Sequence, residues 1–225
     1  MAGRLYRPAE SPRRRGCSRT PGHGTQRAAR AYVPEHPSTR AQTKPHASVT
    51  LKILAISGSL RAQSSNTSLL RLAASVAPPD MHVELYDGLA TLPHFNPDDD
   101  LDVPPPPVLE LRRRVGAADG LLFCSPEYAH GVPGSLKNAL DWLVASVELP
   151  GKPVASLNAS PMATYAQASL LETLTVMSTR IVREACVTIP VTRGDLGADS
   201  AIASPDIARA TRDALDHFAR SIRQP

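Results

Sequence analysis

Five short apolar runs alternate with five helical patterns from residue 51 onward, and this alternation constrains the fold more than any other feature. The apolar runs have the length of strands and span residues 52–57, 82–86, 120–124, 153–158 and 181–189, the last of which need not be regular. Helical spacing follows near residues 67–77, 108–117, 133–144, 162–178 and 204–222. Such alternation indicates parallel strands joined by right-handed helical crossovers, with helices on both faces of the sheet.

Strand order decides where such a sheet binds a ligand. We expect a flavodoxin-like three-layer sandwich, an α/β fold whose five-stranded parallel sheet has the order 2-1-3-4-5. In this order the winding direction reverses between strands 1 and 3, so the ligand crevice lies at their carboxyl ends. The two least generic loops of the chain, residues 58–66 and 125–134, follow these two strands. They are predicted to face each other across the crevice.

The first of these loops has the composition of an anion site. The stretch LKILAISGSLRAQSSNT leads from a strand pattern through a loop of hydroxyl residues, one arginine and one asparagine into a helix. Unpaired N–H groups and the helix dipole stabilise a phosphate at such a point. No G-K-[ST] follows Gly58, which excludes a P-loop, and a G-x-G-x-x-G dinucleotide turn would need three glycines. The loop therefore favours a monophosphate, and an ordinary polar strand-to-helix connection is the alternative.

The charge of the chain is unevenly distributed. Residues 1–50 contain ten Arg and Lys against two Glu, whereas residues 51–225 contain fifteen against nineteen Asp and Glu. The basic segment has no apolar periodicity, so we expect a disordered extension over 1–48 and one folded domain over 49–225. A non-folding prefix is the preferred interpretation, and contact with anionic surfaces is the alternative. The folded part carries no basic, aromatic-rich surface of the kind that binds nucleic acid.

Other sequence features exclude several classes of protein. No run of 18 apolar residues occurs, which argues against a membrane span, and no apolar secretory segment is present. The three cysteines form no C-x-x-C pair and no cluster at metal spacing, so we expect neither a metal site nor a disulfide framework. We therefore expect a cytoplasmic protein.

The second loop carries a motif that is specific in combination with the first. The segment SPEYAHGVPGSLKNALDW, residues 125–142, combines a turn, a Gly-Pro-Gly entry and a helix. Together with GSLRAQSSN it resembles the NADPH-dependent FMN reductase family, a flavodoxin-like group that includes quinone, chromate and azo-dye reductases. The resemblance covers nearly all of residues 51 to about 190.

The resemblance implies which residues contact FMN. The first loop would hold the phosphate and ribityl groups, with Ser65 and Thr67 as weaker additions, and the second loop would lie along the flavin ring. The positions implied as cofactor-binding are Ser59, Arg61, Ser64, Ser65, Asn66, Thr67, Pro126, Glu127, Tyr128 and Gly131. Two departures stand out, because Ala129 and His130 follow Tyr128 where the family often has Asn, and residues 158–161 lack the usual glycines.

The resemblance also implies a function. We expect an oxidoreductase that passes hydride from NADPH or NADH to bound FMN and then electrons to a quinone, a free flavin or a similar small-molecule acceptor. The cofactor carries the chemistry, so no catalytic side chain is assigned. Family members are commonly dimers or tetramers, which implies a homodimer or homotetramer, with the helix over 136–144 at the contact. The alternatives are a flavodoxin-like electron carrier and a non-catalytic regulatory module on the same fold.

Overall fold

The computed structural model describes residues 50–196, 201–202 and 204–224. The expected basic extension over 1–48 therefore lies outside the described residues. The strands are β1 (Leu51–Ser57), β2 (Met81–Leu85), β3 (Gly120–Cys124), β4 (Pro153–Asn158), β5 (Arg180–Ile181) and β6 (Val187–Thr188). The helices are α1 (Ser65–Val76), α2 (Pro106–Ala117), α3 (Gly134–Leu143), α4 (Thr164–Val176) and α5 (Pro205–Arg223), with short 3₁₀ turns between some of them.

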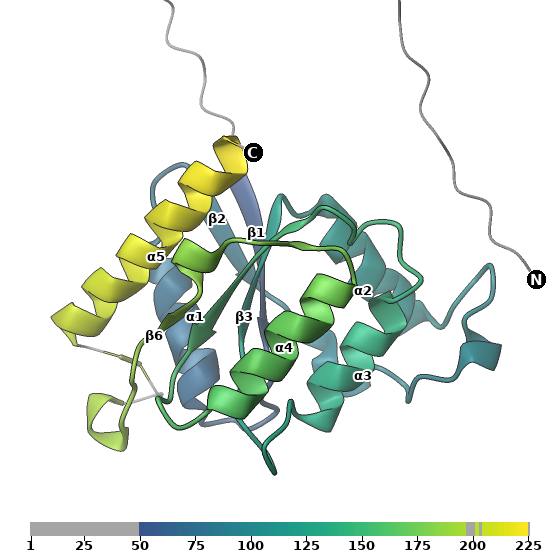
Figure 1. The fold of residues 1–225 in the computed structure, drawn as a ribbon, viewed down its shortest axis with the longest axis horizontal. Helices are drawn as coiled ribbons and strands as arrows, with labels where there is room; N and C mark the ends of the chain where they lie inside the picture. Colours follow the sequence, from purple (N-terminus) through teal and green to yellow (C-terminus); the bar gives the residue numbers. More distant parts are fainter. Residues whose placement is uncertain (1–49, 197–200, 203, 225) are drawn as a thin grey trace, which may run out of the picture. The chain divides into compact units, whose positions relative to one another are not determined.

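The sheet has the predicted order, β2-β1-β3-β4-β5, and its strands pair in parallel (Figure 1). The expected fifth strand, residues 181–189, is divided into β5 and β6, both of which pair with β4. A 3₁₀ turn at Arg183–Ala185 separates them. Val182, Ala185 and Ile189 are buried in the core. Their spacing of three and four residues is not that of a strand, which explains the interruption.

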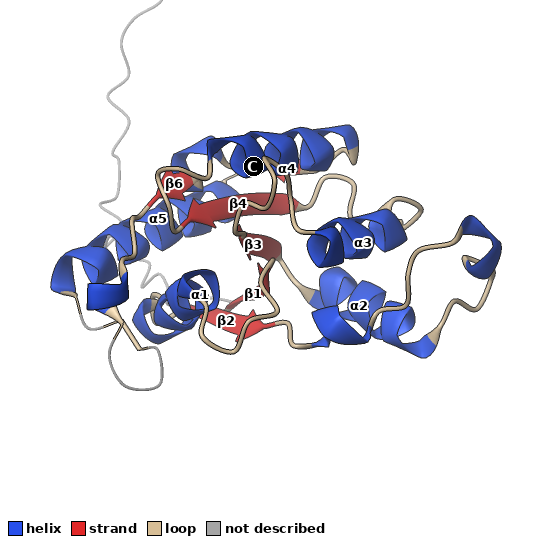
Figure 2. Cartoon of the chain, turned by 90° about the horizontal axis from the view of Figure 1, so that it is seen from below, coloured by secondary structure: helices blue, strands red, loops and turns tan. Residues whose placement is uncertain are grey.

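Helices cover both faces of the sheet, as Figure 2 shows from below, and an apolar layer lies between each face and its helices. Helices α1 and α5 pack on one face through residues such as Leu69 and Phe218. Helices α2, α3 and α4 pack on the other face through residues such as Leu111, Leu140 and Leu170. Burial of both faces accounts for the continuous apolar runs of β1, β3 and β4. The flavodoxin-like sandwich predicted from the alternation is confirmed.

Two helices begin after a serine whose hydroxyl caps them, at Ser204 as the sequence predicts and at Ser64, two residues before the Asn66 that the sequence favours. Ser64 precedes α1, and its hydroxyl accepts a hydrogen bond from the Thr67 amide at 3.4 Å. Ser204 caps α5 in the same way, and Pro205 occupies the first turn. Hydroxyl caps and an early proline are favourable at these positions because they satisfy or avoid otherwise unpaired N–H groups.

The long connection between β2 and α2 is fastened to α3. The side chain of Asn138 accepts a hydrogen bond from the Phe95 amide at 2.7 Å and donates to the Pro93 carbonyl at 2.8 Å. The buried Trp142 indole donates to the same Pro93 carbonyl, and its ring meets Phe95 edge to face. The apolar stripe of α3, expected at a subunit contact, packs within the core of this chain. The side chain of Asn138 thus fastens a loop.

Candidate functional site

The loops after β1 and β3 meet closely at one edge of the sheet. The Gly58 amide donates to the Cys124 carbonyl at 2.9 Å. A Cβ atom at position 58 would lie 2.5 Å from the Ser125 hydroxyl and 3.1 Å from a methyl group of Leu136. Only glycine leaves enough room for this approach. The sequence prediction that the two unusual loops share a crevice therefore has a direct steric basis.

The loop from Gly58 to Ser64 is organised by hydroxyl groups within it and at the strand and helix ends that it joins. Ser57 and Thr67 hydrogen-bond through their hydroxyls at 2.8 Å, while the Ser59 hydroxyl accepts from the Arg61 amide at 3.3 Å. With Ser64 committed to capping α1, several predicted ligand contacts have a structural role as well. The first turn of α1 contains no acidic residue. Its positive end is therefore not neutralised locally, which suits an anion.

A pocket of about 360 Å³ opens beside the start of α1, at the carboxyl ends of the strands. Its volume lies at the lower end of the range of roughly 300–1,000 Å³ that is usual for ligand sites. We call it the switch-point pocket. It is lined by Ser65, Asn66, Ser125, Pro126, Glu127, Ala159, Ser160, Met162, Ala163 and Val191.

The pocket brings together four of the ten predicted cofactor contacts. Ser65, Asn66, Pro126 and Glu127 line it. The remaining six, which do not line it, are Ser59, Arg61, Ser64, Thr67, Tyr128 and Gly131. Ser64 is buried beneath the helix start, whereas Arg61 and Tyr128 are exposed.

The segment after β3 forms a tight hairpin turn. Tyr128 and Gly131 exchange backbone hydrogen bonds of 3.1 and 3.0 Å, and the two residues between them have positive φ angles, 49° at Ala129 and 58° at His130. Turns with two positive φ angles strongly favour Asn and Gly because a Cβ is unfavourable there. The departure from the family pattern noted in the sequence thus falls on a strained turn.

Two contacts join this hairpin to the start of α4. The Glu127 carboxylate accepts a hydrogen bond from the Ala166 amide at 2.9 Å. The His130 and Tyr165 rings stack with centroids 4.3 Å apart and planes inclined by 16°. Helix α4 has no side-chain cap of its own, since its preceding residue is Ala163. Glu127 therefore serves as the cap of α4 as well as part of the pocket lining.

The loop after β4 is ordered by side chains in place of the expected glycines. Asn158 accepts from the Ser160 amide at 3.1 Å and donates to the Ala163 carbonyl at 3.3 Å. The Ser160 hydroxyl in turn accepts from the Met162 amide at 3.3 Å. These bonds place Ala159, Ser160, Met162 and Ala163 along the pocket. Sequence reasoning did not assign these residues, and the position of their loop after the strand beside β3 is the signal that could have identified them.

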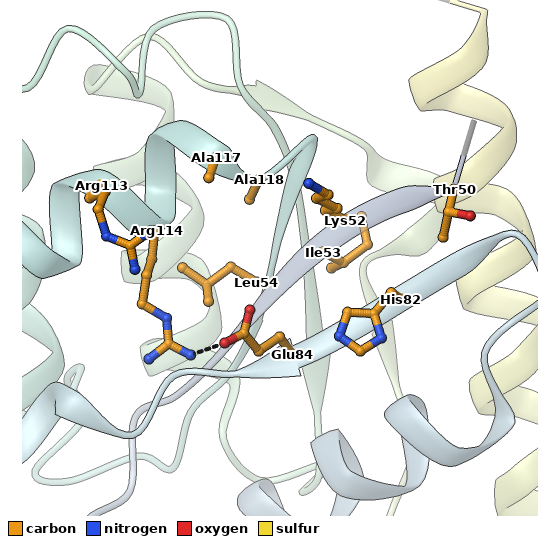
Figure 3. A pocket seen from close by; sticks show the side chains of 10 residues that line it. All are labelled: Thr50, Lys52, Ile53, Leu54, His82, Glu84, Arg113, Arg114, Ala117 and Ala118. Atoms are coloured by element: carbon orange, nitrogen blue, oxygen red, sulfur yellow. Dashed lines mark hydrogen bonds and ion pairs between the residues drawn. The ribbon is translucent and has the colours of Figure 1, made fainter.

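A second pocket, of about 340 Å³, lies between β1, β2 and α2, away from the carboxyl ends of the two strands (Figure 3). Lys52 of β1 and His82 and Glu84 of β2 face it together with Arg113 and Arg114 of α2. Arg114 is paired with Glu84 and with Asp87. Because Lys52 and His82 are the second residues of their strands, this pocket is remote from the carboxyl-end crevice, where ligands bind in such sheets.

Comparison with known sequences identifies the family. A sequence profile described as NADPH-dependent FMN reductase matches residues 51–193. The chain belongs to the NADPH-dependent FMN reductase family. The chain is 45% identical over 112 residues to an NAD(P)H-dependent FMN reductase of Pseudomonas aeruginosa, a match that spans 49% of this chain and 60% of that protein. It is 36% identical over 107 residues to a quinone reductase of Escherichia coli, spanning 46% and 57%.

A solved structure supports the fold. The flavoenzyme FerB, an NAD(P)H:(acceptor) oxidoreductase from Paracoccus denitrificans, superposes with a TM-score of 0.66 at 28% sequence identity. The alignment covers 77% of this chain and 98% of FerB. The family assignment made from the two loop motifs is thus confirmed by the sequence comparisons, and the FerB superposition supports the fold.

The residues of the pocket fit FMN, the cofactor of the family. Ser65 and Asn66 occupy the first two positions of α1, where backbone N–H groups have no intrahelical acceptor. Both line the pocket, and the amide side chain of Asn66 adds a further donor beside them. Because Gly58 has no side chain, the loop after β3 can lie close to the loop that leads into this helix. Together these groups suit a phosphate that is joined to a flat ring system.

Proposed function

We propose that the chain is an FMN-dependent NAD(P)H oxidoreductase that reduces quinones, free flavin or related small acceptors. The observation that carries this proposal is the switch-point pocket, which lies between the Ser65 and Asn66 positions at the start of α1 and residues 125–127, which precede the hairpin turn. Membership of the family supports the same cofactor and the same class of reaction. The curated relatives support quinones as acceptors, because one of them is named a quinone reductase.

The chain's own residues would hold the cofactor from two sides. The N–H groups of Ser65 and Asn66 would donate to the phosphate, and the exposed guanidinium of Arg61 would add positive charge near it. Pro126 and Glu127 would bound the ring on the hairpin side, while Met162 and Ala163 would exclude water on the α4 side. When bound, FMN supplies two-electron chemistry between the nicotinamide donor and the acceptor.

The lining of the pocket suits hydride transfer better than acid–base chemistry. Glu127 is its one titratable side chain among the described residues, and its carboxylate is already committed to the α4 amide. Hydride transfer itself needs no side-chain acid or base, whereas general acid–base catalysis needs a positioned proton carrier. We therefore assign no catalytic side chain, and we propose that the protein binds and orients the cofactor, which carries the chemistry.

We further propose a cytoplasmic homodimer or homotetramer that does not bind nucleic acid. None of the helices in the described part of the chain is both long and apolar enough to cross a bilayer. Exposed apolar side chains at Leu101, Val103, Val144 and Val147 support a subunit contact. Sedimentation at several protein concentrations tests the assembly, and a monomer at all concentrations would contradict it.

Purified protein provides the direct test of the activity. Apo protein is titrated with FMN and then mixed in a stopped-flow instrument with NADPH or NADH, and flavin reduction is followed by its absorbance. Subsequent addition of a quinone should restore the oxidised spectrum over repeated turnovers. A protein that binds FMN but is not reduced by either nucleotide would favour the electron carrier. Absence of FMN binding would refute the proposed function.

A further inference from the structure

Cys124 ends β3, immediately before the pocket-lining residue Ser125, and connects two of the segments that line the switch-point pocket. It is fully buried, and its thiol donates to the Oδ1 atom of Asn66 at 3.2 Å. Ala159 belongs to the same buried cluster as Cys124. Asn66 and Ala159 both line the pocket, from the start of α1 and from the end of β4. The sulfur atom thus joins the end of β3 to the start of α1, where the phosphate is proposed to bind.

The direction of the hydrogen bond from Cys124 determines which end of the Asn66 amide faces the pocket. A planar carboxamide presents its acceptor and its NH₂ donors on different sides. Since Oδ1 is directed at the thiol, Nδ2 is directed elsewhere, and no hydrogen bond from Nδ2 to a described residue occurs. Among the described residues, Ser68 Oγ is the one buried side-chain N or O atom without a hydrogen-bond partner. Asn66 Nδ2 also has no partner among them, so it is not buried and must reach open space. Because Asn66 lines the switch-point pocket, we infer that this space is the pocket.

We infer that Cys124 is a positioning residue, whose thiol holds the Asn66 amide with its NH₂ group toward the bound phosphate or ribityl chain of FMN. This inference rests on the proposed function and names how the chain prepares its own donor. An unpositioned amide could turn its oxygen toward the anion, and that orientation would be repulsive. Fixing the orientation before binding removes this cost.

Burial keeps the thiol in the required form. It raises the pKa of Cys124 to about 12, and the sulfur therefore remains protonated at neutral pH. A protonated thiol is a donor, whereas a thiolate would repel both Oδ1 and a phosphate. The same burial argues against a role for Cys124 as a redox thiol, because the thiolate is the reactive form.

The test separates a positioning role from packing. FMN affinity is measured by fluorescence quenching for wild type, Cys124→Val, Cys124→Ala and Cys124→Ser. Loss of one hydrogen bond predicts about 3- to 10-fold weaker binding for the Val and Ala variants. The Ser variant keeps an O–H donor and is expected within about twofold of wild type, by the same hydrogen-bond scale. Cys186→Val, at the other described cysteine, outside the pocket, serves as the matched control.

A double-mutant cycle identifies Asn66 as the group through which Cys124 acts. In the Asn66→Ala background, Cys124→Val should cause no further loss of FMN affinity, because the positioned amide is absent. In ¹⁵N-labelled apo protein, the side-chain NH₂ signal of Asn66, assigned by its absence from Asn66→Ala, should shift in Cys124→Val and stay in place in Cys124→Ser. This readout needs neither FMN nor activity.

Each outcome has one meaning. Equal FMN affinity of Cys124→Val and wild type, a Cys124→Ser variant as weak as Cys124→Val, or full additivity with Asn66→Ala would overturn the positioning role. An unchanged Asn66 NH₂ signal in Cys124→Val would also overturn it. Failure of wild type to bind FMN, with the NH₂ signal still dependent on Cys124, would refute the proposed cofactor while leaving the orientation of the amide established.

Discussion

Removal of the Glu127 carboxylate should destabilise α4 and loosen one side of the switch-point pocket. Its Oε2 atom accepts from the Ala166 amide at 2.9 Å, and α4 has neither a side-chain cap at Ala163 nor an acidic residue in its first turn. Glu127 therefore supplies both the acceptor and the negative charge that a helix start favours. Loss of a capping side chain costs about 0.5–2 kcal/mol, and the charge adds about 0.3–1 kcal/mol.

Glu127→Ala should consequently lower the free energy of unfolding by about 1–2 kcal/mol. For a domain of this size the melting temperature should fall by roughly 2–8 °C. Glu127→Gln keeps an acceptor oxygen and loses only the charge, so its loss should stay below about 1 kcal/mol. Urea denaturation of the apo protein, followed by circular dichroism, measures both changes.

Glu172 offers a matched control on the same helix. It is exposed, and no described residue forms a hydrogen bond or ion pair with its carboxylate. Glu172→Ala should therefore change stability by no more than about 0.5 kcal/mol. If Glu127→Ala were as stable as Glu172→Ala, the hairpin would not cap α4, and the reasoning about this wall of the pocket would be refuted.

Three further predictions follow from strain, close approach and burial. Ala129→Gly should raise the free energy of unfolding by about 1 kcal/mol, because glycine adopts the φ angle of 49° without strain. A lower melting temperature of the variant in thermal denaturation would contradict this. Gly58→Ala should cost about 1–3 kcal/mol and weaken FMN binding, because the new Cβ would lie 2.5 Å from the Ser125 hydroxyl; a variant with wild-type stability and affinity would refute the close approach. Burial raises the pKa values of Cys124 and Tyr86 to about 12 each, from 9.0 and 10.0, so the unfolded chain loses these protons first and stability should decline between about pH 9 and 12. Cys124→Val should flatten that decline in alkaline denaturation curves, and an unchanged slope would count against the burial effect.

Much of the fold was predictable because it follows from periodicity and caps. The bounds of β3 and β4 agree with the sequence prediction, and Ser204 begins α5 as expected. The fifth strand was less predictable. Its apolar residues are consistent with a strand, but Val182 and Ala185 enter the core through a 3₁₀ turn, and only the surrounding helices determine that path.

The site was predictable where chemistry marks it and less so where packing builds it. The hydroxyl-rich loop and the segment before the Tyr-bearing turn indicated the two sides of the crevice, and Asn66 and Glu127 do line the pocket, whereas Tyr128 does not. Ala159 and Met162 line it as well, but small and apolar loop residues carry no distinctive pattern. The capping role of Glu127 depends on a contact 39 residues away in sequence, which a local motif cannot indicate.

The affinity of Asn66→Asp for FMN tests the central claim most directly. A carboxylate in the first turn of α1 should preserve or stabilise the helix, since that turn has no acidic residue, yet it should repel a phosphate bound there. Calorimetric titration should show saturable binding by wild type and at least about a tenfold loss in Asn66→Asp, whereas Gln224→Glu, which adds the same charge after α5, should bind like wild type. Equal affinity of all three proteins for FMN would contradict a phosphate site at the start of α1.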